Sequence, residues 1–383
     1  MNATGKPISI LFVIDGLEFG GGERTFLQLI EGLPKERFRI YVATSRDRIF
    51  SKILSHKGIA ANHLDLSKRI SFENIRELRK LIKTNKIDII HSQGGRADFY
   101  ARMNGRPLRP GTKIVSTIAT PVEGYDVNPL RKAIYCFFDR LSERFVDRFL
   151  VVSEALRKIM IDGHKVTPDK VVRVYNGIEL NAYCPNTSDQ SSWQIRNEYG
   201  IGATDVLIGA IGRLVWQKGL EYLIKSMPEI VKRHPDIKVI FVGDGPFRGS
   251  LENLCRQLGV EDKSIFTGYR SDTKEILSAI DIKVIPSLAE GFPMVTLEAM
   301  AMEKPIVATC IDGITEQITD GVEGILVPPR DTNALVAAIN AIIENKDLAS
   351  SLGSAARKRV EREFTVEKMI DETEKVYRSL LNQ

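Results

Sequence analysis

The sequence predicts two successive α/β domains, each a doubly wound parallel β-sheet with helices on both faces. Short apolar runs alternate with amphipathic helical patterns along the chain, which is typical of parallel strands joined by crossover helices. The alternation occurs twice, and a polar stretch at residues 186–192 separates the two halves. The length of 383 residues is enough for two or three domains.

The first domain is expected over residues 1–180. Its strand candidates are short and apolar, and helical patterns lie between them. A long charged helix at residues 366–383 is expected to pack back onto this domain. The expected strands are Ile8–Asp15, Phe38–Thr44, Ile87–Ser92, Lys113–Ile118 and Arg148–Ser153, with helices at Glu23–Gly32 and Phe72–Thr84.

Residues 181–204 are interpreted as an interdomain linker, and residues 205–365 as the second domain. The expected strands are Asp205–Gly212, Ile237–Gly243, Ser264–Thr267, Ile282–Pro286, Ile306–Thr309 and Gly324–Val327. The expected helices are Gly219–His234, Arg248–Leu258, Asp272–Ala279, Val295–Met302 and Thr332–Asn345. Two sheets that face each other would leave a cleft lined by the carboxyl ends of their strands, where ligands bind in such folds.

Composition argues against several classes of protein. No run of about 18 apolar residues occurs, so no transmembrane span is expected. The first apolar run, Ile8–Ile14, is too short for the core of a signal sequence. The four cysteines are scattered, which argues against a disulfide framework or a zinc site and suits a reducing compartment. We therefore expect a soluble, cytoplasmic protein.

Charge is unevenly distributed along the chain. Residues 1–185 hold 31 Lys and Arg and 20 Asp and Glu, so they carry +11, whereas the remainder carries −6 of the overall +5. This asymmetry indicates an anionic partner for the first half, such as a membrane surface or a phosphorylated acceptor; solvated helix faces are the alternative. The segment Leu130–Arg140 mixes cations with aromatic residues and is either a membrane-interface helix or a buried connecting helix. Nucleic acid is not expected, because only charge favours it.

Glycines and cations follow two of the predicted strands. Gly20, Gly21 and Gly22 come after the first strand and open a helix, so free amides favour an anion or a sugar there; a tight turn alone is the alternative. Arg213 and Lys218 lie on the loop after the first strand of the second domain. Two cations at a strand end can hold a diphosphate from two sides, unless they form a solvated surface pair.

The strongest signal is the stretch from Glu290 to Glu298. Glu290 follows the predicted strand Ile282–Pro286 on a loop, and Glu298 lies in the apolar helical run Val295–Met302. Carboxylates in such places accept hydrogen bonds from vicinal hydroxyls, as acids do with ribose in nucleotide-binding folds. Glu298 could instead be solvated on the helix surface, but a charge in an apolar run is costly to bury without a partner.

These motifs together resemble glycosyltransferase family 4, which comprises retaining enzymes of the GT-B fold with two Rossmann-like domains facing a central cleft. The resemblance covers essentially the whole chain. It rests on the paired glutamates with Gly-Phe-Pro after the first, the Arg213/Lys218 pair, the glycine loop, and the stretches Val152–Glu154, Tyr175–Ile178 and Gly321–Pro328. No single motif is specific, but the combination is.

The resemblance implies a site for a UDP- or GDP-sugar donor of the hexose type. Arg213 and Lys218 would hold the diphosphate, Glu290 the transferred sugar and Glu298 the ribose. His91 would lie near the sugar or acceptor, or it is a satisfied, partly buried histidine. The implied catalytic residues are Glu290, Arg213, Lys218 and His91. The implied donor-binding residues are Gly21, Gly22, Arg213, Lys218, Gly268, Arg270, Glu290, Gly291, Phe292, Pro293, Met294, Val295 and Glu298.

The resemblance also implies transfer with retention and no metal or other cofactor, and no Asp-x-Asp occurs in the chain. Many family members carry a histidine in the loop after the fourth strand, whereas Val115–Pro121 has none. In a front-face attack the departing phosphate oxygen can take the acceptor proton, so the enzyme mainly positions the reactants and stabilises charge.

The implied role is transfer to a glycan or lipid-linked acceptor in the synthesis of cell-envelope polysaccharide or glycolipid, at the inner face of the membrane. Two other classes stay open. One is a sugar-nucleotide epimerase of similar architecture, and the other is a non-catalytic protein that binds sugar nucleotides.

Overall fold

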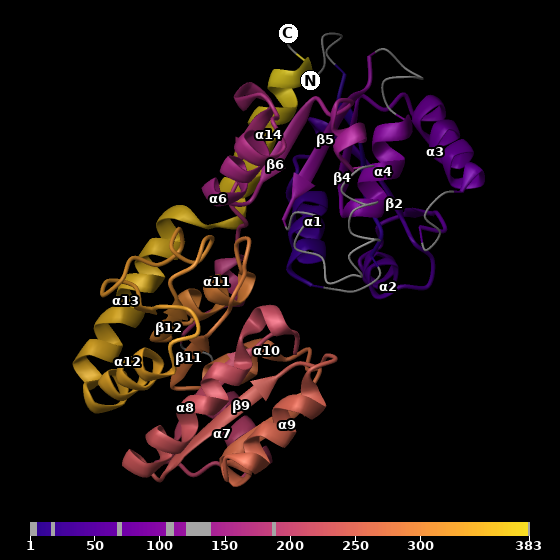
Figure 1. The fold of residues 1–383 in the computed structure, drawn as a ribbon. Helices are drawn as coiled ribbons and strands as arrows, with labels where there is room; N and C mark the ends of the chain where they lie inside the picture. The colour runs from indigo at the N-terminus through magenta and orange to yellow at the C-terminus, as the bar shows by residue number, and fades with distance from the viewer. Residues whose placement is uncertain are drawn as a thin grey trace. The chain divides into compact units, whose positions relative to one another are not determined.

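The chain folds into two compact units, shown in Figure 1. The structure is a computed structural model that describes residues 6–16, 20–66, 71–104, 111–119, 139–185 and 189–381. The first unit comprises residues 1–176 and 366–383, and the second comprises residues 177–365. The expected segment Leu130–Arg140 and the end of Val115–Pro121 lie almost entirely outside the described residues.

The first unit is built on a seven-stranded parallel sheet in the order β3-β2-β1-β4-β5-β6-β7. β1 pairs with β2 on one side and with β4 on the other, so the direction of winding reverses between β1 and β4. The strands are β1 (Ile8–Ile14), β2 (Phe38–Thr44), β3 (Ala61–His63), β4 (Ile89–Gln93), β5 (Lys113–Ile118), β6 (Arg148–Val151) and β7 (Val171–Arg173). The helices are α1 (Gly21–Gly32), α2 (Ile49–His56), α3 (Phe72–Thr84), α4 (Gly95–Asn104), α6 (Glu154–Lys158) and α14 (Val366–Leu381).

Hydrophobic side chains cover both faces of this sheet. Because side chains alternate along a strand, Phe12 of β1 enters a cluster with α1, whereas its neighbour Leu11 enters a second cluster with α3 and α4. The C-terminal helix α14 completes the first cluster with Tyr377 and Leu380. Figure 1 shows α14, in yellow, beside the strands of the first unit. Helix α14 is therefore part of the first unit's core.

The second unit repeats the architecture on a six-stranded parallel sheet in the order β10-β9-β8-β11-β12-β13. β8 lies between β9 and β11, so the winding reverses between β8 and β11. The strands are β8 (Val206–Ile211), β9 (Ile237–Val242), β10 (Ser264–Gly268), β11 (Ile282–Ile285), β12 (Ile306–Thr309) and β13 (Ile325–Val327). The helices are α7 (Asp189–Glu198), α8 (Leu220–Arg233), α9 (Arg248–Gln257), α10 (Thr273–Ala279), α11 (Met294–Ala301), α12 (Thr332–Glu344) and α13 (Lys346–Glu363).

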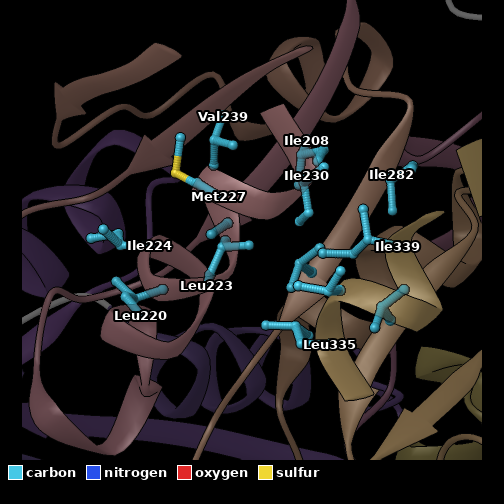
Figure 2. Packing of buried hydrophobic residues seen from close by; sticks show 14 of the residues in the cluster. Ile208, Leu220, Leu223, Ile224, Met227, Ile230, Val239, Ile282, Leu335 and Ile339 are labelled. Carbon is cyan, nitrogen blue, oxygen red and sulfur yellow. The ribbon is translucent and has the colours of Figure 1, made fainter. Parts of the chain in front are cut away.

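One face of the second sheet is closed by α8, α9 and α12. Figure 2 shows Leu223, Met227 and Ile230 of α8 gathered with Ile208 of β8 and Ile339 of α12. These residues are fully buried, so the helices seal that face. The other face packs against α10 and α11.

The boundary between the units differs from the expected linker at residues 181–204. The second unit begins at Gly177, and residues 189–198 form α7 instead of a linker. Arg196 of α7 holds this helix on the unit by donating to Asp281 Oδ2 at 2.6 Å and to the Ala279 carbonyl at 3.2 Å. A polar composition predicts a linker because it cannot reveal such long-range contacts. Among the described residues, no helix is both long and apolar enough to cross a membrane.

Candidate functional site

The loops that follow β8 and β11 meet at the reversal point of the second sheet. Lys218 comes from the loop after β8 and Glu290 from the loop after β11. Lys218 Nζ donates to Glu290 Oε1 at 2.6 Å, and Ser287 Oγ donates to the same oxygen at 2.7 Å. The Lys218 side chain is 24% exposed and the Glu290 side chain 10% exposed, so the pair is partly shielded from water. In doubly wound sheets, ligands bind at such a reversal point.

A small pocket opens beside this ion pair. It is lined by the carboxyl ends of β8 and β11, by Gly212, Lys218 and Glu290, and by Val295 in the first turn of α11. α11 follows directly on Pro293, and the amides of its first turn carry the partial positive charge of a helix N-terminus. The pocket therefore brings an ammonium group, a carboxylate and helix amides to one place, as an anionic, hydroxyl-rich ligand requires.

Glycines let the neighbouring strand-end loops approach this closely. A Cβ atom on Gly243, after β9, would lie 2.0 Å from the carbonyl oxygen of Gly212. A Cβ atom on Gly313 would lie 2.2 Å from the carbonyl oxygen of Gly291, next to Glu290. Both glycines have positive φ angles, +134° and +81°. Any other residue at either position would push the loops of the pocket apart.

Glu298 is buried in α11, one helix turn after Val295 of the pocket, with 3% of its surface exposed. The hydroxyl of Tyr183 donates to Glu298 Oε1 at 3.0 Å. Tyr183 is itself held by Arg357, which donates to its carbonyl oxygen at 2.7 Å. Glu298 is thus not a solvated surface residue, which was the alternative open from the sequence.

The rest of the expected donor-binding stretch, Gly291–Val295, forms the turn into α11. Phe292 is buried against Phe364, with ring centroids 5.3 Å apart at an interplanar angle of 71°. The carbonyl of Pro293 accepts from Gln317 Nε2 at 3.0 Å. These contacts hold the turn in place, so its backbone, and not the Phe292 ring, can face a ligand.

Arg213 and Arg270, both expected in the donor site, lie in different surroundings. Arg213 is exposed on the loop that also carries Lys218. The Arg270 guanidinium lies between Glu198 of α7, at 2.5 Å, and Asp272, at 2.6 Å, and these carboxylates raise its pKa. Arg270 therefore ties α7 to the second unit, and its side chain is committed to two acids. Gly268 accepts a backbone hydrogen bond from Gly243 at 2.9 Å.

The residues expected at the glycine loop lie in the first unit, at the start of α1. The Gly20 amide donates to Glu23 Oε2 at 2.9 Å, which caps the helix. Gly21 and Gly22 form its first turn, and a Cβ atom on Gly22 would lie 2.1 Å from Gln93 Nε2 at the end of β4. Gly22 thus allows α1 to lie close to the carboxyl end of β4.

His91 is fully buried inside the first unit. Its Nδ1 atom lies 2.5 Å from the Tyr377 hydroxyl, and its Nε2 atom lies 2.7 Å from Thr117 Oγ1. Burial lowers the pKa of His91 to about 3, so the ring is neutral at physiological pH. This environment fits the alternative of a satisfied buried histidine, and not a group that contacts substrate.

Three residues of the site were missed from the sequence. Ser287 directly follows the strand that precedes Glu290, so its position was a usable signal. Lys283 is a lysine in the middle of the apolar run Ile282–Pro286, and a charge in a buried strand is itself a signal. Tyr183 had no local signal, because it meets Glu298 only through the tertiary fold.

Comparison with solved structures identifies the fold of the chain. The chain is similar to HepE of Anabaena in complex with UDP, with a TM-score of 0.83, 23% identity, and coverage of 97% of this chain and 100% of that one. It is also similar to sucrose-phosphate synthase of Thermosynechococcus elongatus, with a TM-score of 0.81, 20% identity, and coverage of 98% and 99%. The chain has the GT-B fold of glycosyltransferases.

Comparison with family models identifies the family of the chain. Residues 19–182 match the family described as Glycosyltransferase Family 4, and residues 191–359 match the one described as Glycosyl transferases group 1. The chain belongs to glycosyltransferase family 4.

The chain matches one relative over nearly its full length and another over only part of its length. An uncharacterized glycosyltransferase of Methanocaldococcus jannaschii is 34% identical over 60% of this chain, but the match spans only 59% of that protein. A UDP-Gal:alpha-D-GlcNAc-diphosphoundecaprenol alpha-1,3-galactosyltransferase of Escherichia coli is 24% identical over 98% of each chain. Both relatives are glycosyltransferases by name, as the family of the chain leads one to expect.

Proposed function

We propose that this protein moves a hexose from a UDP-sugar to a glycan or lipid-linked acceptor, with retention of the anomeric configuration. The observation that carries the proposal is the 2.6 Å contact between Lys218 Nζ and Glu290 Oε1 at the reversal point of the second sheet. The ammonium group suits a diphosphate, and the carboxylate suits sugar hydroxyls. The complexes of HepE with UDP and with UDP-glucose support a uridine donor. A GDP-sugar is the alternative.

The donor would bind as follows. Lys218 and the exposed Arg213 hold the diphosphate, together with the amides at the start of α11. Glu290 accepts hydrogen bonds from the hydroxyls of the transferred sugar, and Glu298 from those of the ribose. On donor binding, the Lys218 ammonium would donate to the phosphate as well as to Glu290. The Glu290 carboxylate would then have lone pairs available to accept from the sugar hydroxyls.

The reaction would be a front-face substitution at the anomeric carbon. The bond from this carbon to the diphosphate oxygen breaks, and the nucleoside diphosphate leaves with the electron pair. The acceptor oxygen attacks from the same face, and its proton passes to the departing phosphate oxygen. Lys218 and Arg213 would stabilise the charge that develops on the leaving group, which is the part of the reaction where fixed charges lower the barrier most. These two cations supply the charge that a divalent metal supplies elsewhere, so we propose that transfer is metal-independent.

The acceptor is proposed from two observations. The name of the Escherichia coli relative specifies a diphosphoundecaprenol-linked acceptor. The positive charge of the first 185 residues would favour an anionic, lipid-linked acceptor at the cytoplasmic face of a membrane.

A ligand screen followed by turnover measurements tests the proposal. UDP- and GDP-sugars are compared by the rise in melting temperature, since a ligand that binds only the folded state stabilises it. The best donor is then assayed with glycan and polyprenyl-linked acceptors, and the anomeric configuration of the product is read by NMR. Lys218→Met and Glu290→Gln should each lower kcat/KM by about 10²–10³-fold, as loss of one charge-stabilising group does in other enzymes.

The matched control is the exposed pair Glu221 and Lys225 on α8, whose charged atoms lie 3.9 Å apart. Glu221→Gln and Lys225→Met should leave turnover unchanged. Full activity in both Lys218→Met and Glu290→Gln would refute the donor site. An epimerised sugar released without an acceptor would identify an epimerase, and binding without turnover would identify a sugar-nucleotide binding protein. A product with inverted anomeric configuration would refute retention but would leave the donor site in place.

A further inference from the structure

A fully buried lysine lies in the central strand next to the pocket. Lys283 is on β11, between Ile282 and Val284, and none of its surface is exposed. Ile282 and Val284 belong to the cluster beneath α8 and α12. Because side chains alternate along a strand, Lys283 points to the opposite face, where α10 and α11 pack. Lysine is almost never fully buried without a partner, so its presence here requires an explanation.

The Lys283 amine makes no hydrogen bond with any residue in the described part of the chain. Its strand neighbours in register are Gly209 of β8 and Ile306 of β12, which carry no charge. The charged groups that act on it are Glu298 of α11, Lys218 after β8, and Glu290 after β11. All three belong to the proposed donor site. Lys283 is therefore electrically coupled to that site while remaining covered by protein.

Lys283 balances the negative charge of the two acids of the donor site. Glu290 and Glu298 are both largely buried, and Lys218 pairs with Glu290. A buried carboxylate is costly unless a positive charge compensates it. Of the two acids, Glu298 has the larger effect on Lys283. The Lys283 ammonium is thus the counter-charge for Glu298.

We propose that Lys283 is a positioning residue of the donor site, whose buried ammonium is the counter-charge of the Glu298 carboxylate and so strengthens the binding of the donor's ribose hydroxyls. The inference rests on the proposed function, because Glu298 must face the ribose. It goes beyond that function by assigning a role to a side chain that touches no ligand.

The proposal gives donor binding a specific dependence on pH. Burial lowers the pKa of Lys283 to about 7; Glu298 opposes the fall, Lys218 adds to it, and Glu290 opposes it. The donor's diphosphate adds negative charge near the amine and favours its charged form, so binding raises the pKa of Lys283. A group whose pKa rises on binding gives the tightest binding below its free pKa and weaker binding above it. Affinity should therefore fall as the pH rises through about 7.

The second unit has one histidine, and it lies away from the pocket, so it does not account for a pH dependence of donor binding. The one histidine between residues 177 and 365 is His234, at the end of α8. It lies 3.3 Å from Glu344 and precedes β9, at the amino edge of the sheet. The strand-end pocket is at the carboxyl edge.

The test is calorimetric titration with UDP-glucose, whose diphosphate keeps its charge between pH 6 and pH 8.5. For the wild type we expect affinity to fall about tenfold over this range, which corresponds to a pKa that rises by about one unit on binding. Lys283→Met should bind about tenfold more weakly at pH 6 and should not weaken further as the pH rises. Its melting temperature should be lower than that of the wild type, because methionine leaves the buried Glu298 carboxylate without its counter-charge, so the titrations are run well below that temperature.

Lys304→Met is the matched control. Lys304 is a partly buried lysine of the second unit, but its amine donates to the carbonyls of Ser278 and Ile280, at 3.0 and 2.8 Å. This variant should keep wild-type affinity and the wild-type pH dependence. A double-mutant cycle shows whether Lys283 acts through Glu298: in a Glu298→Gln background, Lys283→Met should change affinity less than twofold. With 2′-deoxy-UDP-glucose the effect of Lys283→Met should likewise shrink.

Two outcomes would overturn the inference while leaving the donor site intact. One is wild-type binding by Lys283→Met at pH 6. The other is a tenfold loss that persists unchanged in the Glu298→Gln background. If the wild type binds no sugar nucleotide at any pH, the proposed function itself fails.

Discussion

Tyr377→Phe removes a single hydroxyl from the core of the first unit. Tyr377 lies on α14, and its hydroxyl lies 2.5 Å from Nδ1 of His91 on β4. A neutral imidazole has one donor and one acceptor, so Tyr377 and Thr117 must play opposite roles on its two nitrogens. Phenylalanine leaves one ring nitrogen buried without a partner, which costs about 1–3 kcal/mol. A domain of 150–250 residues melts about 2–4 °C lower per kcal/mol, so a fall of about 2–12 °C in melting temperature is expected.

The two units can be followed separately in one experiment. Both tryptophans of the chain, Trp193 and Trp216, lie in the second unit, so their fluorescence reports that unit alone. Calorimetry reports both units. Tyr377→Phe should lower the calorimetric transition of the first unit and leave the tryptophan transition in place. UDP-glucose affinity should also be unchanged, because α14 belongs to the first unit.

Tyr41→Phe provides the control. Tyr41 is a partly exposed tyrosine of β2 in the same unit, and its substitution should change stability by no more than about 0.5 kcal/mol. An unchanged calorimetric transition in Tyr377→Phe would contradict the role of the Tyr377–His91 contact in stability. Lost transfer activity at full stability would restore a role for His91 in the chemistry.

Two further predictions concern stability. The first unit should lose about 1.4 kcal/mol per pH unit as the pH falls from 6.5, because the unfolded chain protonates His91 there while burial holds its folded pKa near 3. In urea unfolding, the free energy of unfolding of His91→Phe should not show this dependence on pH. An equal dependence in both proteins would refute the assignment to His91. Gly243→Ala should destabilise the second unit by at least about 2 kcal/mol in urea unfolding followed by tryptophan fluorescence, because its Cβ atom would meet the Gly212 carbonyl at 2.0 Å. Gly249→Ala, in open space on α9, should not destabilise, and equal effects would exclude a steric cause.

The elements of the fold could be predicted from local pattern. The strand expected at Ile282–Pro286 is β11 at Ile282–Ile285, and the helix expected at Thr332–Asn345 is α12 at Thr332–Glu344. β3 and β7 were not expected, because each is a three-residue edge strand that is too short for a periodic signal. Boundaries set by contacts with distant residues, such as those of α7, were also outside the reach of local pattern.

Several residues of the candidate site could also be predicted from local pattern, whereas their contacts could not. Lys218 and Glu290 could be chosen from the sequence because parallel strands place every following loop at one edge of the sheet. Their direct contact needed the strand order, which puts β8 beside β11 although 70 residues lie between the end of β8 and the start of β11. Arg270 shows the opposite case: its two acidic partners, Glu198 and Asp272, could be identified only in the fold.

The sequence by itself determined that this chain is two wound parallel sheets with acids and cations at the strand ends of the second. Those features follow from the spacing of apolar residues and from the order of elements, which are local properties. The tertiary structure alone decided that α14 buries His91 and that Lys283 lies among Glu298, Lys218 and Glu290. Burial and electrostatic coupling depend on which distant segments pack together, and a linear pattern of residues does not contain that information.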